Sequence, residues 1–389
     1  MSVSTWRFTE PDVYLDAAAT TPVRREALEA AWPFLTGEFG NPSSHHQIGE
    51  RAADALEDAR SRVAHVLGMR AGDVSFTSGG TEADNLAVIG IGLASSRGRH
   101  LVTSAIEHEA VLESADFLGR RHGFDVTYCD VSSDGTVTPD SLRTALRDDT
   151  ALVSLSYANN EIGTIADIPA LTAVSREHGV PFHTDAVQAA GWLPLAELGA
   201  DAITIAGHKV GAPKGIGVAA IRGRVPVEPL LHGGGQERGR RSGTENVAFA
   251  VALATALELA EAERAEAAAR ARSVRDDFIT RVLADAPGAF LTGSRASRLP
   301  NHASFCFSTT SGEAVLLELE RRGVTASSGS ACAAGSDEAS HVLTAIGIDA
   351  ATAQTSVRFT FPADASLQHA EAAATAVTAS VHSLSQSFS

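Results

Sequence analysis

Short apolar, β-branched runs alternate with amphipathic segments through the first two thirds of the chain, and this alternation restricts the fold more than any other feature. The strand-like runs are Asp73–Thr77, His100–Ser104, Ala151–Leu155, Val180–Thr184 and Asp201–Ile205. The segments between them, such as Ala110–Arg121 and Ile168–His178, have the periodicity of helices. The alternation therefore predicts an α/β protein with a mostly parallel sheet and helices on both of its faces.

The last third of the chain has a different character, and at 389 residues two domains are expected. Ala248–Leu283 is rich in Ala, Glu and Arg, which predicts a long helix linking two lobes. A strand at Asn301–Ser308 and a helix at Ser340–Ile346 predict a smaller α/β lobe, and the serine-rich end, Ser380–Ser389, is expected to be frayed.

Composition excludes several classes of protein. The net charge of −16 argues against a nucleic-acid-binding protein and against docking on anionic membranes. No run reaches the roughly 18 apolar residues of a membrane span, and the N-terminus lacks the apolar core of a signal peptide. The three cysteines, Cys129, Cys306 and Cys332, are too far apart for a disulfide framework, and no metal-ligand spacing occurs. We expect a reduced, cytoplasmic protein. A short basic cluster, Glu237–Arg241, is a candidate active-site feature.

A glycine turn follows the first of the strand-like runs. Gly79, Gly80 and Thr81 come directly after Val74–Thr77, and Thr81 opens a helix. Backbone N–H groups and a hydroxyl at the positive end of a helix suit a phosphate group. An ordinary tight turn explains the same residues equally well.

Three more polar residues follow apolar runs. Asp185 could cap a helix, and His108 could be a solvated residue at a helix start. Lys209 follows an apolar run where an unpaired ammonium would be costly, and such lysines often form Schiff bases. A phosphate cradle, an acid and a lysine at the ends of strands are together what pyridoxal 5′-phosphate requires.

At this point the sequence resembles the cysteine desulfurases, in the class V aminotransferase group of fold type I pyridoxal-phosphate enzymes. The matching segments are Tyr14–Pro22, Gly40–His46, Thr77–Asn85, Glu107-His108, Asn159–Gly163, His183–Gln188, Gly207–Lys209, His232–Asn246 and Ser327–Cys332. The resemblance implies a seven-stranded sheet in a large cofactor-binding domain, residues 16–255. It also implies a small domain, residues 1–15 and 256–389, that carries the catalytic cysteine loop.

The resemblance also implies a role for each matching residue. Lys209 is expected to hold the cofactor aldehyde as an imine, with Asp185 at the ring nitrogen and Gln188 at the ring hydroxyl. His108 is expected to stack on the ring and to transfer protons. The residues expected at the phosphate are Gly80, Thr81, His208 and, from the opposite subunit, Thr244.

Substrate residues and oligomeric state come from the same resemblance. Asn160 and Arg358 are expected to receive the substrate, because the planar guanidinium suits the carboxylate of an amino acid. Since Thr244 is expected to reach the other subunit's site, a homodimer with shared active sites is implied. The chain departs from the family pattern at Ala206, often serine, which removes one phosphate hydroxyl, and at Ala17, Ala166 and Thr360-Phe-Pro.

Cys332 decides which reaction is expected. It lies in a run of small residues that predicts a mobile surface loop, whereas Cys129 and Cys306 lie in apolar strands and are expected to be buried. In the expected reaction the Cys332 thiolate takes sulfur from L-cysteine as a persulfide and alanine is released. A sulfur-acceptor protein, for iron–sulfur cluster assembly or tRNA thiolation, would follow. The alternatives are a selenocysteine lyase, a transaminase or an inactive binding scaffold.

Overall fold

A seven-stranded sheet forms the centre of the larger lobe in the computed structural model, which describes residues 13–329 and 339–387. Its strands, in spatial order, are β2 (Val74–Thr77), β8 (Gly217–Ile221), β7 (Ala202–Ala206), β6 (Phe182–Asp185), β5 (Thr150–Ser154), β3 (His100–Ser104) and β4 (Asp125–Cys129). The strand β8 is antiparallel to both of its neighbours, and the other strands run parallel to one another. The predicted fold class, with its mostly parallel seven-stranded sheet, is confirmed.

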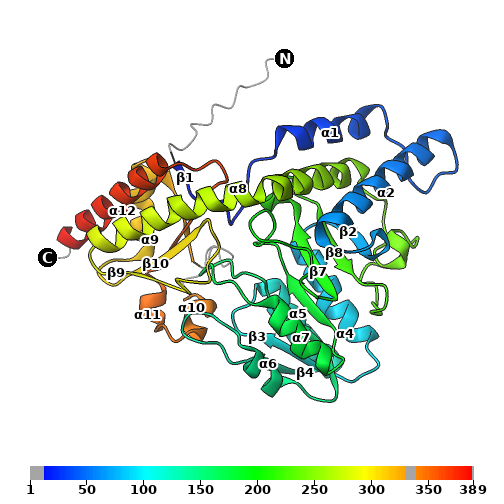
Figure 1. Ribbon diagram of the computed structural model, residues 1–389, viewed down its shortest axis with the longest axis horizontal. Helices are drawn as coiled ribbons and strands as arrows, with labels where there is room; N and C mark the ends of the chain where they lie inside the picture. Colours follow the sequence, from blue (N-terminus) through cyan, green and yellow to red (C-terminus); the bar gives the residue numbers. More distant parts are fainter. Residues whose placement is uncertain (1–12, 330–338, 388–389) are drawn as a thin grey trace.

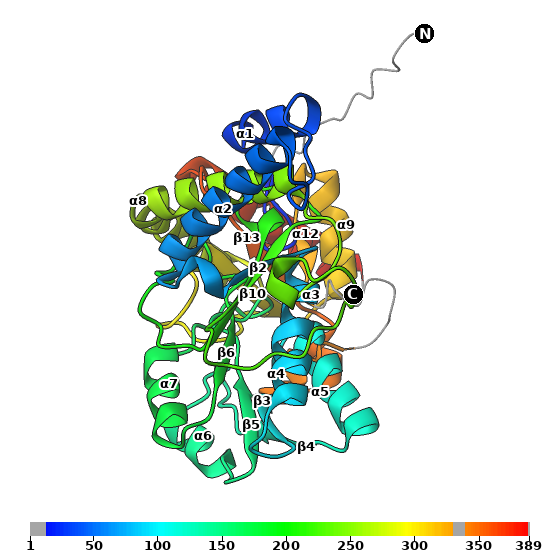
Figure 2. The same cartoon turned by 90° about the vertical axis from the view of Figure 1, so that its right-hand side faces the viewer.

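Helices cover both faces of this sheet, as Figure 2 shows: α6 and α7 lie on one side, and α4 and α5 lie on the other. The helices of the larger lobe are α1 (Arg25–Thr36), α2 (Gln47–Leu67), α3 (Gly80–Asn85), α4 (Ile91–Ala94), α5 (Glu109–His122), α6 (Pro139–Ala145) and α7 (Ile168–Glu177), with the short turns η1 (Ala71–Asp73), η2 (Leu86–Gly90), η3 (Gly207–Lys209) and η4 (Glu237–Gly239). Because both faces are covered, the central strands β3, β5 and β7 are buried along their whole length.

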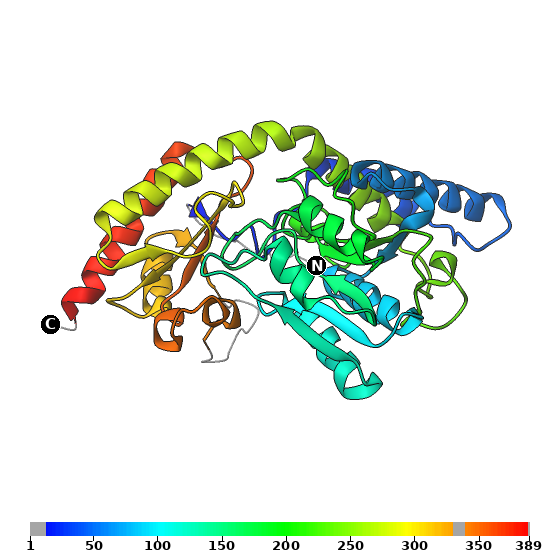
Figure 3. The ribbon, with the colours of Figure 1, turned by 60° about the horizontal axis from the view of Figure 1, so that its bottom comes forward.

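The helix α8 (Val247–Asp285) connects the two lobes, as the sequence predicts, and Figures 1 and 3 show it running along both of them. Val251 and Leu257, in its first half, belong to the core of the larger lobe. Phe278 and Val282, in its second half, belong to the core of the smaller lobe. No helix in the described part of the chain is both long and apolar enough to cross a membrane. The exact domain boundaries stay a prediction.

The smaller lobe has an antiparallel four-stranded sheet packed against helices. Its strands, in spatial order, are β12 (Ser327–Ser328), β13 (Val357–Thr360), β10 (His302–Phe307) and β9 (Ala289–Leu291), and its helices are α9 (Gly312–Arg321), α10 (His341–Ala345), α11 (Ala350–Ala353) and α12 (Leu367–Ser387). The expectation of a frayed end is wrong, because α12 continues to Ser387 and Ser380 is fully buried. Val377 and Val381, one helical turn apart, pack into the core of this lobe and hold the helix in place.

The first described strand joins the two lobes. The strand β1 (Val13–Tyr14) pairs in parallel with β11 (Val324–Thr325), and Asp16 forms a parallel bridge with Thr360. Immediately afterwards the chain passes to the larger lobe, where the backbone of Thr21 bonds to the carbonyl of His208 at 3.0 Å. This segment therefore crosses the space between the lobes at the place where the cavity described below lies.

Candidate active site

A cavity of about 360 Å³ lies beyond the carboxyl ends of the parallel strands, between the two lobes. Nine of the residues singled out by the sequence line it: Gly80, Thr81, His108, Asn160, Asp185, Gln188, His208, Lys209 and Arg358. Eight of these come from the larger lobe, and Arg358 comes from the strand β13 of the smaller lobe. The fold thus gathers in one place residues that are scattered over most of the chain.

The glycine turn after β2 forms one end of this cavity, and its geometry needs glycine. A Cβ atom at Gly80 would lie 3.1 Å from the side chain of Val187 and 3.3 Å from that of Ala206, which is tight packing. A Cβ at Gly217 on β8 would lie 2.6 Å from the carbonyl carbon of Gly79, so only glycine lets β8 approach the turn. Gly80 and Thr81 line the cavity, and a Cβ at Gly79 would have no atom within 4 Å, so this side of the turn is open to a bulky polar group.

Asp185, the last residue of β6, is a buried carboxylate in the wall of the cavity. Its Oδ1 accepts the backbone N–H of Val187 at 2.8 Å. Burial raises the pKa of Asp185, and the hydrogen bond to Val187 and the charges of His108 and Lys209 oppose that shift. A buried carboxylate of this kind fits a cationic ring nitrogen, because a positive partner would offset the cost of its burial.

A second buried carboxylate, Asp84, lies beside Asp185 and was not found from the sequence. Burial, and secondarily the charge of Asp185, raise the pKa of Asp84 well above its usual value. Thr204 donates to Asp84 Oδ1 at 2.6 Å, and Thr204 in turn contacts His183 Nε2 at 3.2 Å. Burial lowers the pKa of His183 to about 3, so this histidine is neutral. Asp84 follows Gly80 by four residues on the same helical face, a spacing that could have revealed it.

The amine of Lys209 is held by the segment that crosses between the lobes. Its Nζ donates to the carbonyl oxygen of Ala18 and, at 2.9 Å, to that of Ala19. The side-chain amide of Gln188 also donates to Ala18 O, at 3.0 Å. Beside Lys209, burial and the nearby lysine charges lower the pKa of His208 to about 4, so that this ring is neutral at pH 7. Two sequence-predicted residues, Lys209 and Gln188, thus share one backbone acceptor.

His108 begins the helix α5 and has a defined orientation. Its Nδ1 accepts the backbone N–H of Ala110 at 3.0 Å, which assigns the proton of the neutral ring to Nε2. The preceding residue, Glu107, is fully buried, and its carboxylate accepts from Ser104 Oγ at 2.6 Å and from Ser156 N at 2.8 Å. Burial raises the pKa of Glu107 to about 7. In this geometry His108 offers a hydrogen-bond donor rather than an acceptor.

Arg358 is buried and reaches the cavity from the smaller lobe. Its Nη2 donates to Asp16 Oδ1 at 2.9 Å, and its Nη1 donates to the carbonyl oxygen of Asn160 at 3.2 Å. Its Nε is buried and has no hydrogen-bond partner among the residues that the structure describes. The guanidinium is therefore fixed on two sides, and Nη1 and Nη2 each have a second N–H, which suits an anionic ligand.

Thr244 lies apart from the cavity and is exposed. It lines a smaller hollow of about 200 Å³ next to the glycine turn, together with Thr77 and Ser78. Arg241, three residues earlier, forms an ion pair of 2.8 Å with Glu82 on α3. Thr244 is thus positioned near the turn but outside the cavity of its own chain.

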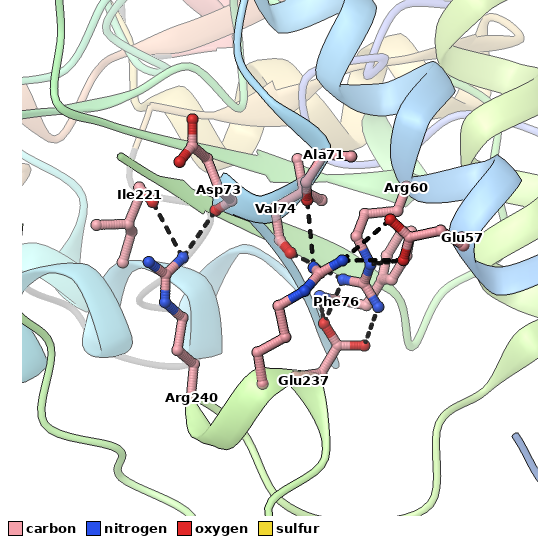
Figure 4. Close-up of polar contacts among 10 residues, drawn as sticks. Glu57, Arg60, Ala71, Asp73, Val74, Phe76, Ile221, Glu237 and Arg240 are labelled. Carbon is pink, nitrogen blue, oxygen red and sulfur yellow. Dashed lines mark hydrogen bonds and ion pairs between the residues drawn. The ribbon is translucent and has the colours of Figure 1, made fainter. Parts of the chain in front are cut away.

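The basic cluster Glu237–Arg241 mainly anchors this segment, and its arginines do not line the cavity. Figure 4 shows Glu237 facing Arg60 of α2, with Nη1–Oε2 and Nη2–Oε1 distances of 2.6 and 3.1 Å, both side chains being buried. Glu237 also accepts the backbone N–H of Phe76 at 2.9 Å. Glu237 and Arg238 both have a left-handed backbone, with φ of 48° and 58°, a conformation that the buried ion pair stabilises.

Two of the three cysteines are located by the structure. Cys129 and Cys306 are buried, as predicted, and burial raises the pKa of their thiols to about 12 and about 11. Neither thiol is therefore a nucleophile at neutral pH. Cys332 lies outside the described residues.

Comparison with known proteins identifies the family. The model of the aminotransferase class-V family matches residues 13–369. A cysteine desulfurase IscS from Dictyoglomus turgidum is 46% identical over 352 residues, which cover 90% of this chain and 89% of that protein. Another, from Methanosarcina thermophila, is 47% identical over 339 residues, covering 86% of this chain and 83% of that protein. The solved structure of a NifS-like protein superposes with a TM-score of 0.89 at 34% identity, covering 96% of this chain and 100% of that chain. The chain belongs to the aminotransferase class-V family and, within it, to the cysteine desulfurases.

Proposed function

We propose that this protein uses pyridoxal 5′-phosphate to remove sulfur from L-cysteine, with release of L-alanine and formation of a persulfide on Cys332. The observation that carries the proposal is the single cavity in which Lys209 and Asp185 of the larger lobe face Arg358 of the smaller lobe. An amine, a buried acid and a carboxylate receptor in one cavity are what chemistry on an amino acid requires of a pyridoxal-phosphate enzyme.

The residues of the cavity fit this cofactor. Asp185 would lie at the ring nitrogen, Gln188 at the ring hydroxyl and Lys209 at the aldehyde. The open backbone of the Gly80 turn, with Thr81 and His208, would hold the phosphate. When bound, the cofactor supplies an electron sink for the negative charge that develops on the α-carbon of the substrate.

The substrate would bind through its carboxylate. Arg358 is held in place by Asp16 and by Asn160 O, and its Nη1 and Nη2 each have a second N–H, so an anionic ligand can bind without reorganising the guanidinium. Asn160 lines the same part of the cavity. An α-amino acid held in this way would direct its amino group toward Lys209.

Cys332 and His108 supply the sulfur chemistry of the proposal. The Cys332 thiolate attacks the sulfur of L-cysteine; an S–S bond forms, the C–S bond breaks, and the β-carbon takes up a proton to give alanine. No external oxidant is consumed, because the sulfur atom moves from one carbon to one thiol. Because Nδ1 accepts the backbone N–H of Ala110, Nε2 is the ring nitrogen through which His108 would exchange a proton with a reacting group.

The test uses two variants with different expected defects. Lys209→Ala should lose the cofactor absorbance and all alanine formation from L-cysteine. Cys332→Ala should keep the absorbance but form no persulfide and almost no alanine. Full alanine formation by Cys332→Ala without an added thiol would overturn the proposal. Formation of a keto acid would indicate a transaminase, and a much faster reaction with selenocysteine would indicate a selenocysteine lyase.

We propose further that the protein is a homodimer with shared active sites. Leu28, Trp32 and Leu35 lie on one face of α1 and are 53, 65 and 55% exposed, and Phe39 just beyond them is 69% exposed. Four large apolar side chains exposed next to one another on a surface helix and just beyond its end are typical of a subunit interface. Thr244 is exposed beside the glycine turn, where a neighbouring subunit could use it. Trp32→Glu should yield monomers in sedimentation, and an unchanged dimer would contradict this choice of interface.

The persulfide would pass to an acceptor protein, of the scaffold type for iron–sulfur cluster assembly or of the tRNA-thiolation type, in the cytoplasm. A protein with a net charge of −16 is not expected to contact nucleic acid directly. Incubation with 35S-labelled cysteine and candidate acceptors would show which one receives the label. Label on RNA with no protein acceptor present would contradict this part of the proposal.

A further inference from the structure

Four arginines gather around one hollow on the side of the molecule where α8 meets the loop between β9 and β10. These are Arg272 and Arg275 on α8 and Arg295 and Arg298 on the loop, and the two segments lie side by side in Figures 1 and 3. The hollow has a volume of about 630 Å³, within the usual range for small-molecule sites. The only acidic residue that lines it is Asp276. In a chain with a net charge of −16, such a concentration of positive charge is unexpected.

The two arginines at the bottom of this hollow, Arg275 and Arg298, are buried. Arg298 is 3% exposed, and its guanidinium donates only to carbonyl oxygens, those of Ile162 and Ser294 at 2.9 Å and that of Thr292. Burial, and then the charge of Arg275, lower the pKa of Arg298 to about 9. A buried cation without a carboxylate partner is costly, and a bound anion would offset that cost.

The two arginines at the rim, Arg272 and Arg295, are exposed to solvent. Within residues 13–329 and 339–387, neither Arg272 nor Arg295 makes an ion pair or a side-chain hydrogen bond. Most other arginines in this part of the chain contact a carboxylate or a backbone carbonyl. Asp276 is engaged by Arg275, at 2.7 Å, so it does not neutralise the rim.

We propose that this hollow binds a small oxyanion with several negative charges, such as a polyphosphate or a polycarboxylate. Guanidinium groups bind phosphates and carboxylates through paired N–H donors. An anion needs at least two charged groups to contact the arginines of α8 and those of the loop between β9 and β10 at the same time. Arg275 and Arg298 are buried at the bottom of the hollow. A compact free anion fits this position better than the acidic surface of a partner protein, because a small molecule can enter the hollow. The inference concerns a site apart from the catalytic cavity and does not depend on the proposed function.

The experiment is isothermal titration of the cofactor-loaded enzyme with pyrophosphate and, separately, with citrate, at physiological salt. Loading keeps the probes out of the catalytic cavity, and salt suppresses weak attraction to surface charge. We expect saturable binding of at least one probe, and the stronger one identifies the class of ligand. The double variant Arg272→Ala/Arg295→Ala should weaken that binding by about tenfold or more, since it removes two guanidinium groups that would donate charge-assisted hydrogen bonds to the anion.

The matched control is Arg70→Ala/Arg121→Ala, which removes two exposed arginines that also lack ion pairs in the described structure but lie on other surfaces. This control should leave binding unchanged within about twofold. The proposal is overturned if neither probe binds saturably, or if the control weakens binding as much as the rim variant does. All four positions are exposed, so neither double variant is expected to unfold. Circular dichroism of both double variants checks that any loss of binding does not come from unfolding.

Discussion

Arg358 and Asp16, which are 342 positions apart in the sequence, form an ion pair of 2.9 Å at the edge of the cavity. Arg358 reaches the catalytic cavity from the smaller lobe, and Asp16 lies on the segment that crosses between the lobes. The guanidinium is thus positioned before any substrate enters. Its planar shape lets one part bind Asp16 while another remains for a ligand.

A lysine at this position cannot do both. Arg358→Lys should therefore raise KM for L-cysteine by roughly tenfold to a hundredfold, with a smaller effect on kcat, because a charge-assisted hydrogen bond of about 1.5–3 kcal/mol is lost. Cysteamine, which has the same thiol and amine but no carboxylate, serves as the control ligand. Its binding, followed by the change in cofactor absorbance, should be almost unaffected. Equal losses for both ligands would show that Arg358 does not receive the carboxylate.

The buried carboxyl group of Glu107 should make stability depend on pH. Burial raises the pKa of Glu107 from 4.5 to about 7, so the folded protein binds this proton more tightly than the unfolded chain does. Its stabilising contribution is present below pH 4.5 and is lost as the pH rises through about 7. At about 1.4 kcal/mol per pKa unit, the loss amounts to about 3 kcal/mol.

Glu107→Gln removes this titration and keeps the shape of the side chain. Its free energy of unfolding in urea, minus that of the parent protein, should increase by about 3 kcal/mol between pH 5 and pH 8. Glu109→Gln, at an exposed position two residues later, should show no such change. A pH-independent difference for Glu107→Gln would mean that the carboxyl group is already ionised at pH 5.

The buried ion pair between Arg60 and Glu237 should contribute to stability far more than its exposed neighbour. Glu237→Gln removes the buried carboxylate that pairs with two nitrogens of Arg60 and leaves that buried charge only the longer contact of 3.3 Å to the half-exposed Glu57; breaking a buried pair in this way typically costs about 3–5 kcal/mol. Arg238→Ala removes a partner of Glu57 in a pair whose side chains are 42 and 51% exposed, and should cost less than about 1 kcal/mol. Urea denaturation of the two variants compares these values. Similar losses would contradict the burial of Glu237.

Ala206 offers a gain-of-function test of the phosphate site. It is buried, lines the cavity and packs close to Gly80, so a serine hydroxyl would be directed to the expected phosphate position. Ala206→Ser should tighten cofactor binding by about tenfold, since a hydrogen bond to a charged group contributes about 1.5–3 kcal/mol. Ala190→Ser, at a buried position outside this cavity, is the control. Equal or weaker cofactor binding by Ala206→Ser, measured by equilibrium dialysis, would place the phosphate elsewhere.

The residues at the strand ends could be predicted from the sequence because each follows a recognisable apolar run. Lys209 and Asp185 are of this kind: the residue type gives the chemistry, and the position after a strand gives the location. Long, regular elements such as α8 were predicted for a similar reason, since their composition and length are unambiguous. Gln188, His208, Asn160 and Arg358 have no such local signal, and only the resemblance to the cysteine desulfurases predicted them.

The partners of these residues could not be predicted. Asp16 pairs with Arg358 and Glu237 pairs with Arg60 only through tertiary contacts, and no local pattern encodes such pairs. The strand β8 was not among the predicted strands, and its antiparallel orientation has no signal of its own because an apolar run has the same composition in either direction. The end of α12 was expected to fray because serine is frequent there, but burial of Val377 and Val381 determines its structure.

The route of the chain through the cavity has a consequence for biosynthesis. The lining of the cavity includes Ala18 and Ala19 from the start of the chain and Arg358, which leaves the ribosome only when synthesis is nearly complete. A nascent chain can therefore fold its larger sheet early but cannot form a finished binding pocket. The carboxylate receptor expected at Arg358 is the last part of the pocket to be translated, so the growing polypeptide lacks it until synthesis is almost finished.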